Sequence, residues 1–443
     1  MRTTARLGLG ILCVATAACD GLLGINLVFV DASAPDATAH DAGAGDAGTK
    51  DAPVDATTHD ATAADAPPDT RVPDAHPPAD AGRDAPPCSP NLETDPDNCG
   101  RCGHSCLGGQ CIAGTCQPKP VSSPQTLTGV PNFLVVAGGK VFWTQGGQAG
   151  DYGAFYATSS GGDAFSVTVD PLSTLGWGIQ TDGVAVYFVS IGQGVFVCPF
   201  PGCGPDAGIR TVANTNAVSG PIPWTISGIG LGSGVIYVTS NYAVGTNSGF
   251  LTRCDHPGDA ASCTNVLPNQ EPTTNSPVVV DGGVLLAFEG ASFAGGSIAT
   301  CPATGACGTN LYLDQMVTSP QYLTADTTRA YWTEWTGQSD AGVTLGRVMG
   351  CVRGNCPLTA LIYASDQAKP EGIATDGVYV YWANISAPSV LACPVAGCPD
   401  GGPIVLAADA ATGGAPFQVA LDDAGVYWTN TLAAGTIVRV AKP

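Results

Sequence analysis

Five cysteine pairs recur at one position of a repeat that occupies most of this 443-residue chain. Each pair follows a short apolar strand signal with aromatic residues, and seven such signals occur at intervals of about 45–50 residues. The signals at 141–145 and 426–430 have no cysteine pair after them. A unit that recurs in this way indicates one repeated supersecondary structure and not a series of separate domains.

The order of strands is the same in each repeat. An apolar strand ends in a turn such as TDG at 181–183 or 375–377, and the aromatic strand follows. A third strand runs into the first cysteine, and a fourth begins at the second cysteine. Four antiparallel strands per repeat are typical of a propeller blade. The sequence therefore predicts an all-β fold, a seven-bladed β-propeller over 120–443. A six-bladed ring, with the repeat at 276–313 packed differently, is the alternative.

The two ends of the array suggest how the ring closes. The last repeat stops at Pro443, where other repeats have their first cysteine, so it lacks a fourth strand. The segment 124–130 has a strand pattern but belongs to no repeat. We expect it to pair with the last blade, because closure removes the unpaired backbone edges of an open array.

The cysteine spacing predicts local disulfides between the third and fourth strands. Residues opposite each other in an antiparallel pair have Cα atoms ~4.5–5.5 Å apart, which suits a disulfide. Disulfides in this number also indicate an oxidising compartment. The expected pairs are Cys198–Cys203, Cys254–Cys263, Cys301–Cys307, Cys351–Cys356 and Cys393–Cys398.

A small module at 88–118 precedes the array and contains six further cysteines. They are Cys88, Cys99, Cys102, Cys106, Cys111 and Cys116. Three disulfides are expected, in one of fifteen pairings that the spacing leaves open. A zinc site that uses Cys99, Cys102 and His104 is the alternative. The core DPDNCGRCGHSCLGGQC resembles the cysteine-rich module of the plant stigma-specific family. Similar modules are found in exported proteins of delta-proteobacteria.

Residues 20–87 form a linker of low complexity. The dipeptide Asp-Ala recurs through it nearly every five residues, and apolar residues follow no helical or strand period. Such a segment cannot bury enough surface to offset its ordering entropy, and its acidic side chains repel one another. We therefore expect a disordered, extended stalk.

Residues 1–19 have the features of a secretory signal: two arginines, an apolar run and small residues before Cys19. Small residues before a cysteine resemble the bacterial lipobox, and this implies that Cys19 is acylated after cleavage. An ordinary signal peptide is the alternative. The predicted location is a bacterial envelope membrane, the outer membrane or the cell surface, with lipid as the only attachment.

The aromatic strands resemble the YWTD repeats of receptor propellers related to the low-density-lipoprotein receptor. The best matches are Tyr331-Trp332-Thr333-Glu334 and Tyr427-Trp428-Thr429-Asn430. The resemblance implies a ring that binds a protein or another ligand. The family's fourth-position aspartate is absent here, and its propellers have six blades, so its polar contacts between blades are not carried over.

Few residues in the array are suited to catalysis. Its one histidine, His256, lies between Cys254 and Cys263. Aspartates recur at the first turn of the blades, as Asp-Gly turn chemistry explains. A calcium ring at the channel mouth is the alternative reading of these aspartates, which are Asp182, Asp281, Asp326, Asp376 and Asp422. A formal net charge of −21 disfavours nucleic acid.

The sequence thus favours a monomeric, surface-anchored, non-enzymatic propeller that binds an extracellular protein, peptide or glycan. We expect it to use no cofactor and to have no catalytic residue or metal ligand. An extracellular hydrolase, lyase or lactonase with carboxylates at the channel mouth is the alternative.

The anchoring hypothesis has a direct test. We expect Cys19→Ser to move the exported protein from the membrane fraction to the soluble fraction, because the thiol that would carry the acyl chains is lost. Fractionation and mass spectrometry of the mature N-terminus check this. Unchanged fractionation together with an unmodified N-terminus in the wild type would contradict the hypothesis.

Overall fold

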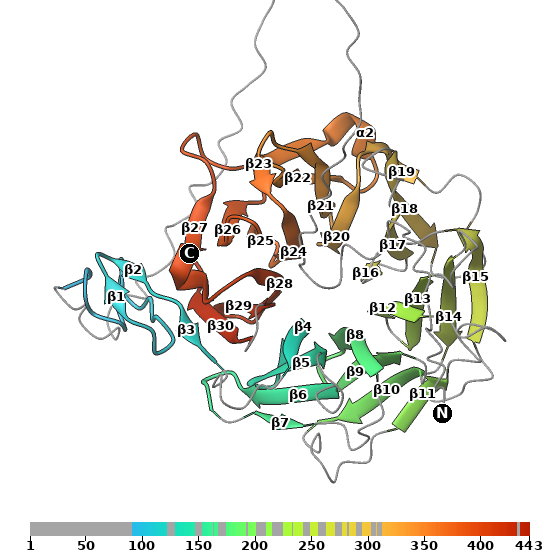
Figure 1. Cartoon of the computed structure of the whole chain (residues 1–443), viewed down its shortest axis with the longest axis horizontal. Helices are drawn as coiled ribbons and strands as arrows, with labels where there is room; N and C mark the ends of the chain where they lie inside the picture. The colour runs from blue at the N-terminus through green and yellow to red at the C-terminus, as the bar shows by residue number, and fades with distance from the viewer. Residues whose placement is uncertain are drawn as a thin grey trace, which may run out of the picture. The chain divides into compact units, whose positions relative to one another are not determined.

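The computed structural model describes most of the chain from residue 91 onwards as a ring of seven four-stranded antiparallel sheets (Figure 1). The described residues are 91–121, 129–146, 153–162, 164–166, 174–191, 194–200, 210–214, 225–232, 234–241, 249–255, 263–270, 277–280, 283–288, 295–302, 307, 312–431 and 435–443. The prediction of seven blades is confirmed. The six-bladed alternative is wrong, because the repeat at 276–313 forms a blade of its own.

The blades follow the chain order. Blade 1 contains β4 (Val130–Ala137), β5 (Lys140–Gly146), β6 (Gly153–Thr158) and β7 (Phe165–Ser166). Blade 2 contains β8 (Thr174–Thr181), β9 (Ala185–Ile191), β10 (Gly194–Pro199) and β11 (Arg210–Asn214). Blade 3 contains β12 (Thr225–Gly232), β13 (Val235–Asn241), β14 (Gly249–Asp255) and β15 (Cys263–Gln270). Blade 4 contains β16 (Val278–Val280), β17 (Gly283–Phe288), β18 (Gly296–Pro302) and β19 (Tyr312–Val317).

Three further blades complete the ring. Blade 5 contains β20 (Pro320–Ala325), β21 (Arg329–Gln338), β22 (Thr344–Val352) and β23 (Leu361–Ala368), with α2 (Cys356–Thr359) before its last strand. Blade 6 contains β24 (Pro370–Thr375), β25 (Tyr379–Asn384), β26 (Ser389–Pro394) and β27 (Ile404–Ala408), and η3 (Asp409–Thr412) follows it. Blade 7 contains β28 (Pro416–Leu421), β29 (Gly425–Asn430), β30 (Ile437–Ala441) and β3 (Lys119–Pro120). The module has the hairpin of β1 (Cys111–Ile112) and β2 (Thr115–Cys116).

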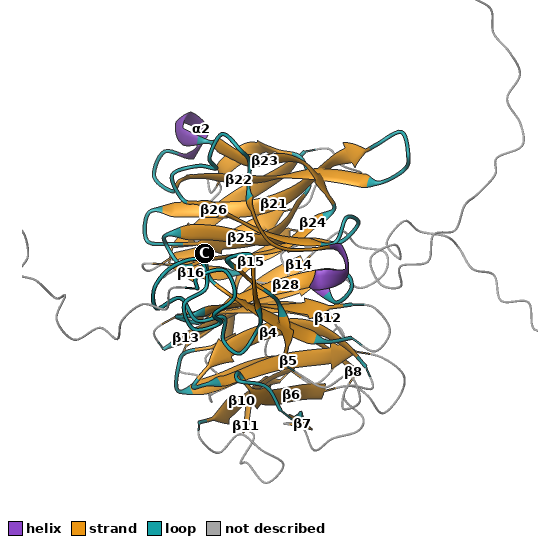
Figure 2. Ribbon diagram, turned by 90° about the vertical axis from the view of Figure 1, so that its left-hand side faces the viewer, coloured by secondary structure: helices purple, strands orange, loops and turns teal. Residues whose placement is uncertain are grey.

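The first strand of each blade lies next to the centre of the ring, and the fourth lies outermost (Figure 1). The strands run between two faces that consist of loops (Figure 2). In an antiparallel blade the turn after the first strand and the loop after the third are at the same end. We call this end the turn face. Within the described residues, no helix is long and apolar enough to cross a bilayer.

Large aromatic side chains fill the space between blades. Trp143, Trp332, Trp382 and Trp428 occupy the same position in the second strands of four blades, and each is 0 % exposed. Each blade is one sheet, so both of its faces must be covered by a neighbouring blade. Burial of such a side chain contributes about 1.5–3 kcal/mol, so this repeated position is a main source of ring stability.

A threonine hydroxyl connects neighbouring blades at the position after the tryptophan. Thr333 Oγ1 accepts a hydrogen bond from the Tyr322 amide of its own blade at 3.2 Å and donates to the Glu371 carbonyl of blade 6 at 2.7 Å. Thr429 Oγ1 likewise accepts from the Gln418 amide at 3.1 Å and donates to the Asn132 carbonyl of blade 1 at 2.9 Å. A polar link between blades is therefore present, although the sequence had not indicated one.

Proline and glycine permit the close approach of blades near this link. A Cβ atom on Gly346 of blade 5 would lie 2.7 Å from the Pro370 ring of blade 6. A Cβ on Gly435 of blade 7 would lie 2.3 Å from the Pro131 ring of blade 1. Real Cβ atoms do not approach other atoms so closely, so glycine is required at these positions for packing.

The ring closes between its first and last parts, but through a different segment from the one predicted. Lys119 and Pro120 of β3 pair with Arg439 and Val438 of β30 as the outer strand of blade 7. Most of the predicted segment, 124–130, lies outside the described residues, and its last residue, Val130, begins the inner strand of blade 1. The closing strand lies upstream of the predicted segment. The sequence did not indicate it, because a strand of two residues is too short to show a periodic pattern.

The threonine link generates a prediction for stability. We expect Thr333→Val to lower the free energy of unfolding by about 1–3 kcal/mol, since the buried Glu371 carbonyl and Tyr322 amide lose their partner. Thr336→Val is the matched control, because Thr336 is exposed and bonds within its own hairpin. Urea unfolding monitored by tryptophan fluorescence measures both. Equal losses of unfolding free energy in the two variants would show that the hydrogen bond between blades does not stabilise the ring.

Candidate functional site

The cysteine pairs of the array form local disulfides in the structure. Their Cα atoms are 4.0, 5.0, 4.8 and 4.8 Å apart in Cys254–Cys263, Cys301–Cys307, Cys351–Cys356 and Cys393–Cys398. Cys198 is also disulfide-bonded, whereas Cys203 lies outside the described residues.

The second cysteine opens the fourth strand in blade 3 alone among these four blades, and there the two cysteines are direct register partners. In blades 4, 5 and 6 the fourth strand begins later, at Tyr312, Leu361 and Ile404. In those blades the disulfide therefore closes the loop on the turn face instead of joining two paired strands. The prediction that these disulfides join the third and fourth strands therefore holds only in blade 3. In the other three blades the second cysteine lies in the loop, before the fourth strand begins.

The module is held by disulfides. Cys99 pairs with Cys111 and Cys106 with Cys116, and Cys102 is also disulfide-bonded. Cys88 lies outside the described residues. A disulfide sulfur is not the thiolate that zinc requires, so the zinc alternative loses its cysteine ligands. His104 does not face a cysteine sulfur either: its Nδ1 lies 2.7 Å from the Cys99 carbonyl oxygen.

The recurring aspartates cap the first turns of their blades. In the turn of blade 6, Asp376 Oδ1 accepts the amides of Val378 and Tyr379 at 3.0 and 2.8 Å, and Oδ2 accepts the Tyr381 hydroxyl at 2.9 Å. The same arrangement joins Asp182 to Tyr187, Asp326 to Tyr331 and Asp422 to Tyr427. Asp281 lies outside the described residues. The spacing Asp-x-x-x-x-Tyr is the sequence signal of this aspartate–tyrosine hydrogen bond and could have been recognised in the sequence.

These contacts set the electrostatics of the turns. Burial by itself would raise the pKa of Asp326, but hydrogen bonds from Tyr331, Thr328 and Arg329 outweigh it and lower the pKa. Burial and the contact with Asp326 raise the pKa of Tyr331, and burial and the contact with Asp422 raise that of Tyr427 to about 12. Asp326 is thus an ionised acceptor, and Tyr331 and Tyr427 are neutral donors.

Aromatic rings from three blades meet across the centre of the ring. Phe133 of β4, Tyr322 of β20 and Phe417 of β28 have ring centroids 5.7–6.4 Å apart. Phe133 and Tyr322 are 4 and 6 % exposed. The inner strands of blades 1, 5 and 7 therefore contact one another through a small apolar cluster, and in this part the channel is filled by side chains.

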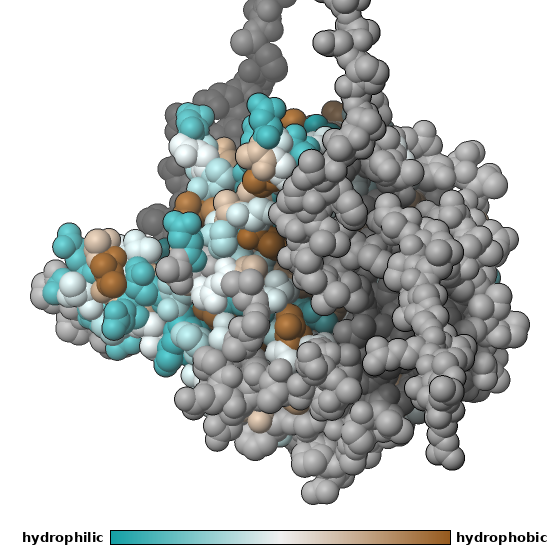
Figure 3. All heavy atoms as spheres, in the orientation of Figure 1, coloured by the Kyte–Doolittle hydropathy of each residue, from teal (hydrophilic) through white to brown (hydrophobic). Residues whose placement is uncertain are grey.

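A cavity with mixed chemistry lies between the module and the turn face of blades 6 and 7. Its volume is about 410 Å³, and we call it the module groove. Its walls are Arg101, Gly103, His104, Ser105 and Leu107 of the module, Asp376, Val378, Tyr379 and Tyr381 of blade 6, and Asp423, Ala424, Lys442 and Pro443 of blade 7. The described atoms visible in Figure 3 over the module and adjacent blades are mainly hydrophilic, with small separate apolar patches.

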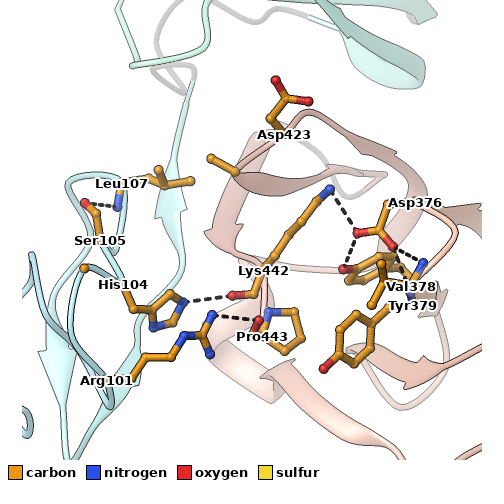
Figure 4. A pocket seen from close by; sticks show the side chains of 13 residues that line it. Arg101, His104, Ser105, Leu107, Asp376, Val378, Tyr379, Asp423, Lys442 and Pro443 are labelled. Carbon is orange, nitrogen blue, oxygen red and sulfur yellow. Dashed lines mark hydrogen bonds and ion pairs between the residues drawn. The ribbon is translucent and has the colours of Figure 1, made fainter. Parts of the chain in front are cut away.

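An ion pair lies in the wall of the module groove. Lys442 Nζ lies 3.0 Å from Asp376 Oδ2, and both side chains are 18 % exposed (Figure 4). Burial would raise the pKa of Asp376, but the turn amides, Lys442 and Tyr381 together lower it. The pair joins the end of blade 7 to the first turn of blade 6 and holds the groove in shape.

Side chains of the module and of blade 7 also contact main-chain oxygens across the joint. Arg101 Nη2 donates to the Pro443 oxygen at 2.9 Å, and His104 Nε2 lies 2.8 Å from the Lys442 oxygen (Figure 4). Arg439, 7 % exposed, donates to the carbonyls of Leu107 and Ser159. The module is therefore a fixed part of the ring.

Sequence reasoning missed the module groove. The sequence does not indicate that Arg101, His104 and Lys442 share a site, because more than 300 residues separate the module from the chain end that it contacts. Cys19 and His256 lie outside the described residues, so their predicted roles stay predictions.

No protein-family model and no curated protein sequence matches this chain. Among solved structures, oligogalacturonate lyase from Vibrio parahaemolyticus is similar with a TM-score of 0.52 and 11 % identity, over 74 % of this chain and 93 % of the lyase. A puromycin-hydrolysing peptidase from Mycobacterium tuberculosis is similar with a TM-score of 0.50 and 11 % identity, over 73 % of this chain and 54 % of the peptidase. At this identity the likeness is one of fold.

The turn motif generates a prediction with a defined pH dependence. A lowered folded-state pKa means that Asp326 adds stability above its unfolded-state value, ~3.9, and loses it as the pH falls through the folded value. We expect Asp326→Asn to cost about 1–2 kcal/mol at pH 7 and less at pH 2.5. Denaturant unfolding at both values measures this. Asp340→Asn, at an exposed loop residue, is the control. A loss of unfolding free energy for Asp326→Asn that is the same at both pH values would contradict the lowered pKa of Asp326.

Proposed function

We propose that this protein is an exported, lipid-anchored binding protein of a bacterial cell envelope. The propeller is a rigid platform, and its loops and the module groove recognise an extracellular protein, peptide or glycan. The runner-up is an extracellular hydrolase, lyase or lactonase with carboxylates at the channel mouth.

The observation that carries this proposal is that the recurring aspartates accept hydrogen bonds within their own turns. An enzyme of the alternative kind needs carboxylates that converge on a substrate. Asp182, Asp326, Asp376 and Asp422 instead accept hydrogen bonds from their own turns, one in each of four blades. Their repeated use as turn caps supports a structural role for the acidic residues on this face and leaves recognition to the surfaces around them.

The module groove has the size and lining of a small binding site. Pockets for small ligands or side chains have volumes of about 300–1,000 Å³ and combine apolar walls with a few polar groups. Val378 is 61 % exposed, and Tyr379 and Arg101 line the same groove. An aromatic face next to hydrogen-bond donors suits a sugar ring or a peptide side chain.

The disulfides and the N-terminal segment support the proposed compartment. Disulfides persist in oxidising compartments, and the described ones occur in both the module and the ring. Together with the predicted signal sequence and Cys19, they support export with retention at a membrane.

The test presents the mature protein to peptide arrays and to neutral and acidic oligosaccharides, including oligogalacturonate. We expect saturable binding with the ligand recovered chemically unchanged. Val378→Asp should weaken binding about tenfold, ~1.4 kcal/mol, because it places a charge on the apolar wall. Val184→Asp is the matched control: Val184 has the same turn position in blade 2, is 68 % exposed and lies outside the groove. Ligand turnover, or equal effects of both variants, would contradict the proposal.

A further inference from the structure

A second cavity lies on the turn face between blades 1 and 2. Its volume is about 380 Å³, and we call it the lysine pocket. The described residues that line it are Gly138 and Lys140 of blade 1, and Gly183, Val184 and Phe200 of blade 2. Pockets for small ligands have volumes of about 300–1,000 Å³. The lysine pocket therefore has the size of a site for one small molecule.

The lysine pocket repeats the position of the module groove at another blade junction. Four of its lining residues occupy the same places in their blades as four that line the groove. These pairs are Lys140 and Tyr379, Gly183 and Asp423, Val184 and Ala424, and Phe200 and Lys442. In the last pair, each residue donates its amide to the carbonyl of a turn residue of its own blade, at 2.8 Å to Val184 and 3.0 Å to Ala424. The backbone thus forms a similar hollow at both junctions, and the side chains decide what each can bind.

The two cavities differ in their charges. In the module groove Lys442 pairs with Asp376, so the protein itself neutralises the cation. In blade 1, Ala137 takes the place of that aspartate, and Phe142 takes the place of the tyrosine that binds it. Lys140 forms no ion pair with another residue that the structure describes. The described lining of the lysine pocket therefore has one positive charge and no carboxylate.

Aromatic rings position the lysine and form an apolar wall. Lys140 Nζ lies 4.4 Å from the centroid of the Tyr156 ring, which is a cation–π distance. Tyr156 and Phe200 both pack on Phe142, with ring centroids 5.7 and 5.3 Å from it. An ammonium group has three N–H donors, and one ring face does not engage them all, so it can also bind an anion. Val184, 68 % exposed, extends the apolar wall.

We propose that the lysine pocket binds a small organic monocarboxylic acid with an aromatic body. Its carboxylate pairs with the Lys140 ammonium, and its ring lies against Phe200 and Val184. Charge complementarity selects the carboxylate, because the ligand supplies the negative charge that Asp376 supplies to Lys442 in the module groove. The Phe200 ring favours an aromatic partner, since offset or edge-to-face contact between rings adds to the area that they bury.

The turns at the rim of the lysine pocket leave it open. A Cβ atom on Gly138 or Gly183 would meet no other atom within 4 Å. Asp182, in the same turn as Gly183, does not supply the missing carboxylate, because its Oδ1 accepts the Val184 amide and its Oδ2 the Tyr187 hydroxyl. The pocket is separate from the module groove, so this inference goes beyond the proposed function and does not depend on it.

The test measures the binding of phenylacetate to the full mature protein by titration calorimetry, with phenylacetamide as the uncharged analogue. We expect saturable binding of phenylacetate and about tenfold weaker binding of phenylacetamide. Lys140→Met keeps a long side chain without the charge and should weaken phenylacetate binding about tenfold, whereas Lys140→Arg should retain most of the affinity. Lys369→Met is the matched control and should have no effect, because Lys369 lies over another ring, that of Trp335, outside the pocket.

Two further variants separate the lysine pocket from the module groove. Val184→Asp should weaken phenylacetate binding about tenfold, because it places a negative charge beside the ligand's carboxylate. Val378→Asp, at the module groove, should leave phenylacetate binding unchanged. A module groove that binds no ligand would contradict the proposed function and would not alter either of these expectations.

A peptide of residues 51–66, from the acidic linker, tests the other source of carboxylates. We expect it not to displace phenylacetate, because its aspartates have no aromatic body to lie against Phe200. Displacement by this peptide would overturn the assignment of a small acid. Equal affinities for phenylacetate and phenylacetamide, or an unchanged affinity in Lys140→Met, would overturn the lysine pocket as a carboxylate site.

Discussion

Closure of the ring by two residues of chain is the constraint on which the rest of the structure depends. Each blade is a single sheet with two faces to bury, and a blade at the end of an open array would leave one face and one edge exposed. β3 supplies the missing outer strand of blade 7, and Thr429 binds the Asn132 carbonyl of blade 1 at the same seam. The seven four-stranded sheets thereby form one closed ring in which each blade packs between two others.

The contacts between blades divide into an apolar and a polar part that serve different purposes. The buried tryptophans contribute apolar contact area between blades. Apolar contact by itself permits small shifts of one sheet over the next. The threonine link and the proline–glycine contact fix the relative height of neighbouring blades, because a hydrogen bond and a close approach each permit one position. Together they account for a regular ring built from loosely similar repeats.

The turn face combines rigidity with variety. Aspartates lock the first turns, disulfides lock the loops after the third strands, and the module is fixed against blades 6 and 7 through bonds from cations to main-chain oxygens. Main-chain oxygens are available whatever the side chains are, so such a joint tolerates sequence change around it. Side chains that project from these fixed turns, such as Val378, can then vary without loss of the scaffold, which suits a surface for recognition.

The sequence by itself determined the elements that repeat. Seven aromatic strands, in-phase cysteine pairs and Asp-Gly turns each appear several times, and repetition makes a weak local signal readable. It therefore predicted the fold class, the blade order and the partners of four array disulfides, whereas the pairing in the module stayed open. The tertiary structure alone decided what occurs once: the closing strand at Lys119–Pro120, the aromatic cluster at the centre, and the groove where His104 and Arg101 meet Lys442 and Pro443. These contacts join residues hundreds of positions apart, and no local pattern records them, because their geometry exists only after the ring has closed.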